Sequence, residues 1–270
     1  MTTNDVRLVV CDVDGTLVRG NKTLPDANIA ASRRLHEAGI AMSLISGRPM
    51  SGMLEIPEAL GIDGPLSAFN GGTMFNREGM LGTPQRLAPE RVLRVLSILD
   101  EAGVDAWLFA YGRWYARDAH NPHVPRERLS SGVEPTLRSD LANLCDAVDK
   151  IVGVSDDAEL LKRVESEVRD ATRGDASVAL SQPYFLDVTA LLANKGDGMA
   201  AVASAMGVPL ACVAVMGDMR NDLPMFERAG LSIAMGQAPE AVRAAADWTT
   251  GSNEEDGVSQ AIDRLLGERP

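Results

Sequence analysis

Two carboxylates stand two positions apart near the start of the chain, in the pentapeptide DVDGT, which contains Asp12 and Asp14. Two more, Asp218 and Asp222, lie close together near the other end. Brought to one place, these carboxylates would repel one another and raise their own pKa values. A hard divalent cation with oxygen ligands removes that repulsion, and Mg²⁺ with carboxylates, water and a substrate phosphate fits best. The residues predict a magnesium site, against the alternative that DVDGT is only an acidic turn.

Short apolar runs before these polar residues predict the strands that position them. Expected strands are residues 6–11, 40–45, 66–69 and 211–216, and expected helices are residues 26–38, 196–206 and 257–266. Alternation of strands and helices predicts a parallel sheet. Because ligands bind beyond the carboxyl ends of parallel strands, Asp12, Ser46 and Asp218 are expected to meet at one edge of the sheet, with Lys195 close by.

The middle of the chain has a different pattern, in which strands follow one another. Expected strands are residues 105–111, 114–117, 150–154, 177–181 and 185–189, expected helices are residues 89–102 and 157–172, and residues 122–128 are expected to form a loop. This pattern predicts an α+β layer. We therefore predict an α/β fold in which residues 1–83 and 190–270 form a doubly wound parallel, Rossmann-like domain and residues 84–189 form an inserted domain.

Four motifs in this order resemble the haloacid dehalogenase (HAD) superfamily. They are DVDGT after a buried strand, Ser-Gly-Arg at residues 46–48, a lone Lys195 before a helix, and GDMRND from residue 217. The insertion between the second and third motifs resembles that of the Cof-type branch, subclass IIB, whose α+β cap is of type C2B. The resemblance implies an HAD core with a cap and the activity of an HAD-type phosphoric monoester hydrolase. Its expected substrates are small phosphomonoesters, namely sugar phosphates, nucleotides or phosphorylated cofactors.

The resemblance also implies a role for each carboxylate. Asp12 would attack phosphorus and form an aspartyl-phosphate intermediate. Asp14 would protonate the leaving alkoxide and then activate water, a role that suits a carboxyl group whose pKa is raised. Asp12, the backbone carbonyl of Asp14 and Asp218 would hold Mg²⁺, with Asp222 as a supporting member of the metal site.

Five further residues are expected to contact the phosphoryl group or the rest of the substrate. Ser46 would donate a hydrogen bond to the phosphoryl oxygens, and Lys195 would neutralise their charge and orient Asp12. Gly47 and Arg48 follow in the second motif, and Asn221 would form hydrogen bonds near the last one. Arg48 would contact substrate or instead cap the turn after the strand.

Composition limits the classes of partner. Lys and Arg number 26 against 38 Asp and Glu, which gives a formal net charge of −12. This balance argues against binding to nucleic acid or to an anionic membrane, both of which need a basic face. We find no signal segment and no apolar run long enough to span a membrane, and therefore expect a cytoplasmic protein. Its expected partner is a small phosphorylated metabolite, and it would be a monomer or homodimer.

Two other functions remain open from the sequence. A phosphomutase or other phosphotransferase on the same fold would pass the phosphoryl group to an alcohol instead of water. A non-catalytic phosphometabolite-binding protein would need none of the catalytic side chains, all of which are present here.

Two weaker patterns are interpreted as structural. His120 and His123 lack the further ligands of a metal site and are expected in a solvated loop. The aromatic residues of the predicted hairpin are expected to pack in the core of the inserted domain, with a substrate contact as the alternative. They are Trp107, Phe109, Tyr111, Trp114 and Tyr115.

Overall fold

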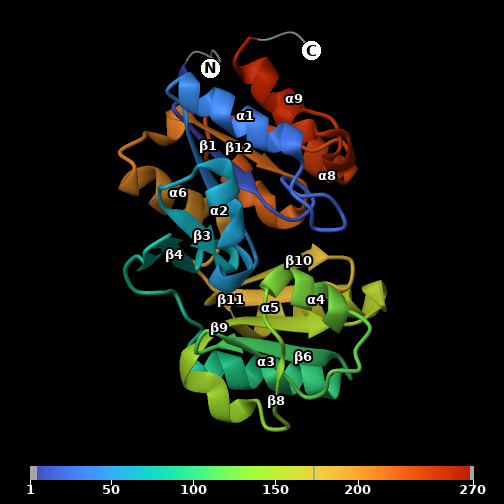
Figure 1. Ribbon diagram of the computed structural model, residues 1–270. Helices are drawn as coiled ribbons and strands as arrows, with labels where there is room; N and C mark the ends of the chain where they lie inside the picture. Colours follow the sequence, from blue (N-terminus) through green and yellow to red (C-terminus); the bar gives the residue numbers. More distant parts are fainter. Residues whose placement is uncertain (1–4, 173, 268–270) are drawn as a thin grey trace.

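An eight-stranded sheet forms the centre of the first domain in the computed structural model, which describes residues 5–172 and 174–267 (Figure 1). The strand order is β14-β13-β12-β1-β2-β3-β4-β5. All neighbours from β14 to β3 pair in parallel, whereas β4 and β5 are antiparallel. The strands are β1 (Leu8–Asp12), β2 (Ala41–Ile45), β3 (Leu66–Ala68), β4 (Thr73–Asn76), β5 (Gly79–Met80), β12 (Val213–Gly217), β13 (Leu231–Ala234) and β14 (Trp248–Thr249).

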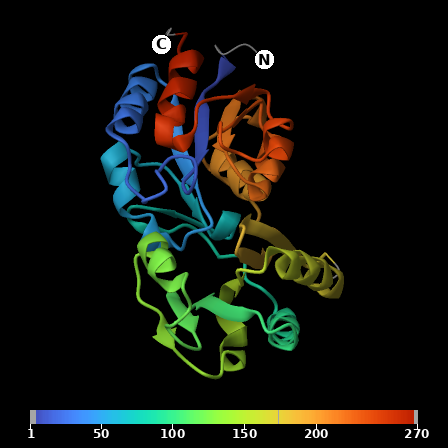
Figure 2. The same ribbon diagram turned by 90° about the vertical axis from the view of Figure 1, so that its right-hand side faces the viewer.

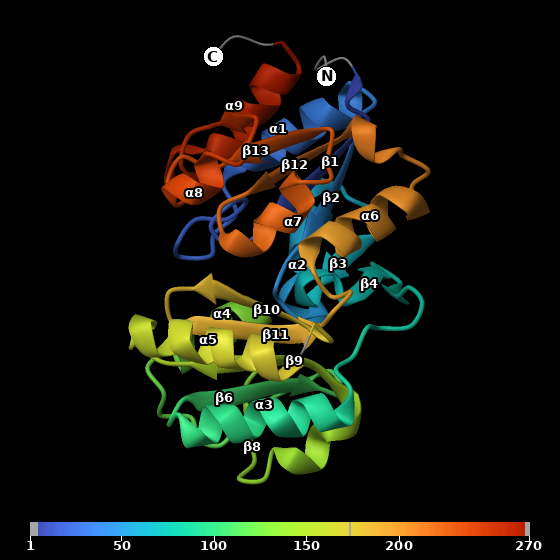
Figure 3. The same cartoon turned by 180° about the vertical axis from the view of Figure 1, so that it is seen from behind.

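Helices cover both faces of this sheet (Figures 1 and 3). One face packs against α1 (Asp26–Glu37), α2 (Glu55–Leu60) and α9 (Gly257–Leu265), and the other against α6 (Lys195–Ala205), α7 (Leu223–Phe226) and α8 (Glu240–Arg243). Along β1, Val9 and Cys11 pack on the α1 side, and Leu8 and Val10 on the α6 side. A strand that is buried on both faces has a continuous run of apolar residues, and this run is the pattern that predicted β1. We call this unit the core domain, and the doubly wound fold is confirmed.

A six-stranded sheet of order β10-β11-β9-β6-β7-β8 forms the second unit, which we call the cap domain. Its strands are β6 (Asp105–Ala110), β7 (Arg113–Ala116), β8 (Thr136–Leu137), β9 (Val148–Val154), β10 (Ala176–Gln182) and β11 (Phe185–Ala190). The helices α3 (Pro89–Glu101) and α5 (Ala158–Thr172) cover one face, and α4 (Val124–Ser131) lies on the other, below the core domain (Figure 2). The boundaries between the two domains, placed after residues 83 and 189, stay a prediction.

The loop predicted at residues 122–128 is wrong, because most of it belongs to α4. Pro125 lies in the first turn of this helix, where no backbone N–H is needed for an intrahelical hydrogen bond, so it does not interrupt the helix. Gly132 ends the helix in the left-handed conformation, with φ at 69°. The other predicted strands and helices are present with shifted ends, while α2, α7, α8, β4, β5, β8, β13 and β14 were not predicted.

Four of the hairpin aromatics pack in the cap domain as predicted. Trp107, Phe109 and Trp114 lie on the α4 side of the sheet and Tyr115 lies on the α3 side. The prediction is wrong for Tyr111, which is 57% exposed at the hairpin turn. No helix in the described part of the chain is both long and apolar enough to cross a membrane.

Candidate active site

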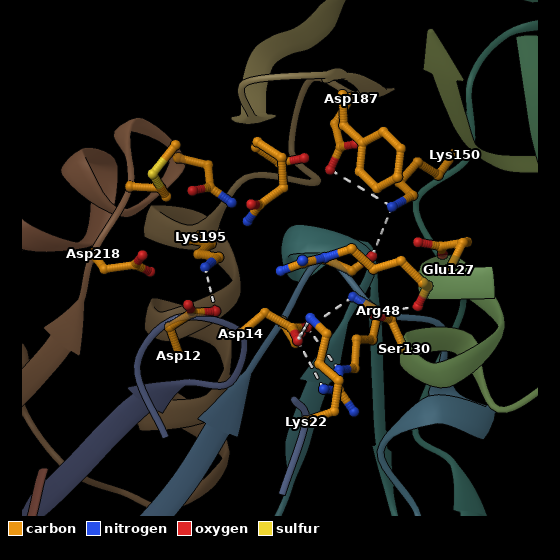
Figure 4. Close-up of a pocket in the computed structure, with 18 residues that line it drawn as sticks. Asp12, Asp14, Lys22, Arg48, Glu127, Ser130, Lys150, Asp187, Lys195 and Asp218 are labelled. Carbon is orange, nitrogen blue, oxygen red and sulfur yellow. Dashed lines mark hydrogen bonds and ion pairs between the residues drawn. The ribbon is translucent and has the colours of Figure 1, made fainter. Parts of the chain in front are cut away.

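The carboxyl ends of three neighbouring strands bring the first predicted site residues together. β1 lies between β12 and β2, with Cys11 opposite Met216 and Asp12 opposite Ile45. Asp12 ends β1, Ser46 follows β2, and Asp218 follows β12. These three side chains therefore lie at one edge of the sheet, where they line a single cavity between the core and cap domains (Figure 4).

Lys195 joins two buried carboxylates at the bottom of this cavity. Its Nζ donates hydrogen bonds of 2.6 Å to Asp12 Oδ1 and of 2.6 Å to Asp222 Oδ1. Burial raises the pKa of Asp12 to about 7, an effect that Lys195 opposes and Asp222 reinforces. Although burial acts against its positive charge, the two carboxylates raise the pKa of Lys195, which stays charged.

Three carboxylates gather next to Lys195. Oxygens of Asp12, Asp218 and Asp222 lie within 4.8 Å of one another. Burial, followed by the charges of Asp12 and Asp222, raises the pKa of Asp218 well above its ordinary value. The negative charge of this group exceeds what Lys195 balances, and carboxylate oxygens are the ligands of hard cations, so the donor set fits Mg²⁺.

Within this group, Asp222 differs from the other two carboxylates. Its Oδ2 accepts hydrogen bonds of 2.8 Å from the backbone N–H groups of Asp218 and Met219. It therefore holds the loop after β12 in place, while Asp12 and Asp218 face the cavity.

Gly15 allows the first and last motifs to approach each other. Its φ is +82°, a conformation that side chains disfavour. A Cβ atom there would lie 2.3 Å from Asp218 Oδ2, so any larger residue would displace the carboxylate.

Asp14 points away from Asp12 and is held by two cations (Figure 4). Arg48 donates from Nε to Asp14 Oδ2 and from Nη2 to Asp14 Oδ1, both at 2.7 Å, and Lys22 also forms an ion pair with Asp14 Oδ1. Burial would raise the pKa of Asp14, but the hydrogen bonds and charge of Arg48, reinforced by Lys22, hold it well below its ordinary value. The expectation of a raised pKa at Asp14 is wrong, because the sequence did not show that these cations pair with it.

The remaining predicted contact residues surround the same cavity. Ser46 Oγ accepts a hydrogen bond of 3.1 Å from the backbone N–H of Arg48. Asn221 Nδ2 donates to Asn70 Oδ1 at 3.2 Å, while Asn221 Oδ1 is buried without a hydrogen-bond partner. The carbonyl of Gly47 accepts a hydrogen bond of 2.9 Å from Lys150 Nζ of the cap.

The empty space between these side chains, open solvent included, amounts to about 570 Å³. Sequence reasoning missed much of its lining: Lys22, Arg126, Glu127, Ser130, Lys150, Ser181, Gln182, Phe185, Asp187 and Met219. Two of these carried a usable signal, since Lys150 and Asp187 place charges inside apolar strand patterns, where a charge needs a reason. The sequence around Glu127 carried no such signal, because its segment was interpreted as a loop.

The histidines of the cap lie elsewhere. His123 Nε2 is 2.7 Å from Asp156 Oδ1, and its ring stacks on Tyr184 with centroids 4.0 Å apart. The side chain of His120 is 96% exposed. Neither is among the described residues that line the cavity.

Comparison with known proteins decides the family. A family model for haloacid dehalogenase-like hydrolases matches residues 9–262. The chain belongs to this family. The sequence-based assignment is confirmed, and with it the interpretation as an HAD-type hydrolase.

Relatives of this HAD-type hydrolase match it over nearly their full length. It is 26% identical to the 5-amino-6-(5-phospho-D-ribitylamino)uracil phosphatase YcsE of Bacillus subtilis, covering 96% of this chain and 95% of that one. It is also 26% identical to the pyridoxal phosphate phosphatase YbhA of Escherichia coli, covering 95% of this chain and 97% of that one. Among solved structures, an HAD subclass IIB sugar phosphatase superimposes with a TM-score of 0.84 at 25% identity. The match covers 97% of this chain and 99% of that one.

Proposed function

We propose that this chain is a Mg²⁺-dependent phosphatase that hydrolyses small phosphomonoesters through an aspartyl-phosphate intermediate. The observation that carries the proposal is the placement of Asp12. Its carboxylate faces the cavity at the end of β1, is held by Lys195 at 2.6 Å, and lies beside Asp218. A nucleophile, a fixed cation and a second carboxylate at one point form the arrangement that phosphoryl transfer requires.

Each residue of this group has a proposed task. Asp12 attacks phosphorus, and Lys195 keeps Asp12 oriented and offsets the charge of the phosphoryl oxygens. Mg²⁺, when bound, supplies further neutralisation of that charge. Asp12, the backbone carbonyl of Asp14 and Asp218 would hold the ion, supported by Asp222 through the loop that it fixes.

Asp14 is the proposed acid and base, but it must change its partners first. The ion pairs with Arg48 and Lys22 favour its ionised form. It can protonate a leaving alkoxide only after rotating away from Arg48 and taking up a proton from solvent, and the proton that it later removes from water restores its acid form. We infer that substrate oxygens entering near Ser46 and Gly47 compete for Arg48 and release Asp14.

Small phosphorylated metabolites are the proposed substrates. The curated relatives are named for a ribitylaminouracil phosphate and for pyridoxal phosphate, both small phosphorylated molecules. The net charge of −12 supports a small substrate instead of a nucleic acid or membrane. We further propose a cytoplasmic location and a monomer or homodimer.

The test is phosphate release from a panel of phosphomonoesters, with Mg²⁺ and with a chelator, for the wild type and Asp12→Asn. We expect turnover that requires Mg²⁺ and is lost in the variant, together with a phosphorylated Asp12 trapped in the wild type. A folded wild type that releases no phosphate from any ester would contradict the proposal. Faster transfer to an added alcohol than to water would favour a phosphotransferase instead.

A further inference from the structure

Three chargeable side chains of the cap domain are buried in the wall of the cavity that holds Asp12. Glu127 comes from α4, Lys150 from β9 and Asp187 from β11, and their exposed fractions are 6%, 5% and 3%. Figure 4 shows them on the side of the cavity opposite Asp12 and Asp218. Burying charged groups is costly unless they are paired or have a ligand to bind.

The hydrogen-bonding capacity of these three side chains is only partly used. Asp187 Oδ2 accepts a hydrogen bond of 3.2 Å from Asn70, but Asp187 Oδ1 is buried without a partner. Lys150 Nζ has three protons, one of which bonds Gly47 at 2.9 Å, while Asp187 Oδ2 lies 3.6 Å away. In the described part of the chain, no group donates a hydrogen bond to the carboxylate of Glu127.

The chemistry of the wall selects the kind of group that can lie there. Two acceptors and one donor with free capacity match hydroxyl groups, each of which both donates and accepts. A flat heteroaromatic ring needs apolar surface, yet of the 18 described residues around the cavity, Phe185 and Met219 are the members with large apolar side chains.

We propose that Glu127, Lys150 and Asp187 form a hydroxyl-binding subsite for the leaving group, so that this enzyme prefers phosphorylated sugars or polyols to flat heteroaromatic phosphates. The inference rests on the proposed phosphatase activity and adds the substrate class and the residues that select it. A hydroxyl-rich leaving group would fill the free positions on Asp187 Oδ1 and Glu127. A ligand without hydroxyls would leave these carboxylate oxygens buried and unpaired. Its kcat/KM would therefore be much lower than that of a hydroxyl-bearing ligand.

The test compares kcat/KM for glucose 6-phosphate, ribitol 5-phosphate and pyridoxal 5′-phosphate, each divided by the value for 4-nitrophenyl phosphate. In the wild type we expect at least one of the two polyhydroxylated esters to exceed pyridoxal 5′-phosphate by about tenfold or more. Asp187→Asn and Glu127→Gln, which conserve volume, should each lower the relative value for that ester by about tenfold. Glu159→Gln is the matched control, because Glu159 lies on the exposed surface of the cap.

Deoxy analogues of the preferred ester separate binding from folding. If the subsite binds hydroxyls, removing the hydroxyl that it binds should lower kcat/KM of the wild type by about tenfold. The same change should affect kcat/KM of the variants little. An equal loss for all esters in both variants, or a wild-type preference for pyridoxal 5′-phosphate, would overturn the subsite while leaving the phosphatase intact. No hydrolysis of any ester, 4-nitrophenyl phosphate included, would overturn the proposed function and this inference with it.

Discussion

Lys195 is the residue on which the electrostatics of the site depend most. It lies between Asp12 and Asp222 with hydrogen bonds of 2.6 Å to both, and all three side chains are buried. Removing one partner of a buried ion pair leaves the opposite charge unpaired in a medium that solvates it poorly. The lysine therefore contributes to folding as well as to the chemistry proposed at Asp12.

We predict that Lys195→Met lowers the free energy of unfolding by about 3–5 kcal/mol without Mg²⁺ and abolishes phosphatase activity. Chemical denaturation and a phosphate-release assay measure the two effects. Lys162→Met is the control, because Lys162 is exposed and paired with exposed Glu159, where an ion pair contributes little. Equal stability of the two variants would contradict the prediction.

Glu127 makes stability depend on pH in a predictable direction. Burial raises its pKa from an ordinary value of 4.5 to about 7. Between these values the folded protein holds a proton that the unfolded chain has lost, so the contribution of this group to stability falls as pH rises from about 4.5 to 7. Above pH 7 the destabilising effect is complete.

Glu127→Gln should remove this dependence. On going from pH 5 to pH 8, we expect the variant to gain stability over the wild type on the order of 1–3 kcal/mol. Denaturation curves at both pH values measure the change, with Glu159→Gln on the exposed cap surface as the control. The same difference between variant and wild type at pH 5 and pH 8 would show that burial does not perturb this carboxyl group.

At the scale of elements, the contact between α4 and the 3₁₀ turn Met50–Gly52 joins the cap to the core. Ser51 Oγ donates a hydrogen bond of 2.8 Å to the carbonyl of Ser131. A Cβ atom on Gly52 would lie 2.0 Å from the carbonyl oxygen of Ser130, so glycine is what allows this close approach. Because α4 also carries Glu127, the contact fixes the position of one wall of the cavity.

Gly52→Ala should push α4 away from the core domain. We expect kcat/KM to fall by about tenfold or more, because a displacement near 1 Å disturbs the alignment of groups around the substrate. Overpacking should also lower the free energy of unfolding by about 1–3 kcal/mol. Gly64→Ala is the control, since its Cβ would lie at an ordinary 3.5 Å from Met206. Kinetics with 4-nitrophenyl phosphate and thermal melting measure both effects, and unchanged kinetics would show that α4 does not position the site.

At the scale of the whole molecule, two domains with separate sheets build one cavity. The core domain contributes Asp12 and Asp218, while the cap domain contributes Lys150 and Asp187. Cap and core are also joined by the hydrogen bonds from Lys150 to Gly47 and from Asn70 to Asp187. A ligand that occupies the cavity therefore affects the stability of the folded chain as a unit.

Mg²⁺ should raise the melting temperature of the wild type, because a ligand that binds only the folded state stabilises it. At a hundred times its Kd the gain is about 2.7 kcal/mol, and a chelator should reverse it. Asp218→Asn should lose most of this response, whereas Asp118→Asn, with a side chain that is 63% exposed, should keep it. A melting temperature of the wild type that is independent of Mg²⁺ would contradict the proposed metal site.

The core fold and the meeting of Asp12, Ser46 and Asp218 could be predicted from the sequence alone. Each follows a buried apolar strand, and parallel strands end at a common edge, so the order of residues along the chain is enough to place them together. The inserted position of the second unit was also readable, because its strands follow one another instead of alternating with helices.

The contacts of Asp14, and the cap residues that face the cavity, became visible only in the packed chain. Arg48 and Lys22 reach Asp14 through side-chain directions that no spacing specifies. Lys150 and Asp187 line the cavity because one face of the cap sheet turns toward the core. That orientation depends on how the two layers pack against each other. Charges inside apolar strand patterns could single out these two residues, but not show that they face Asp12.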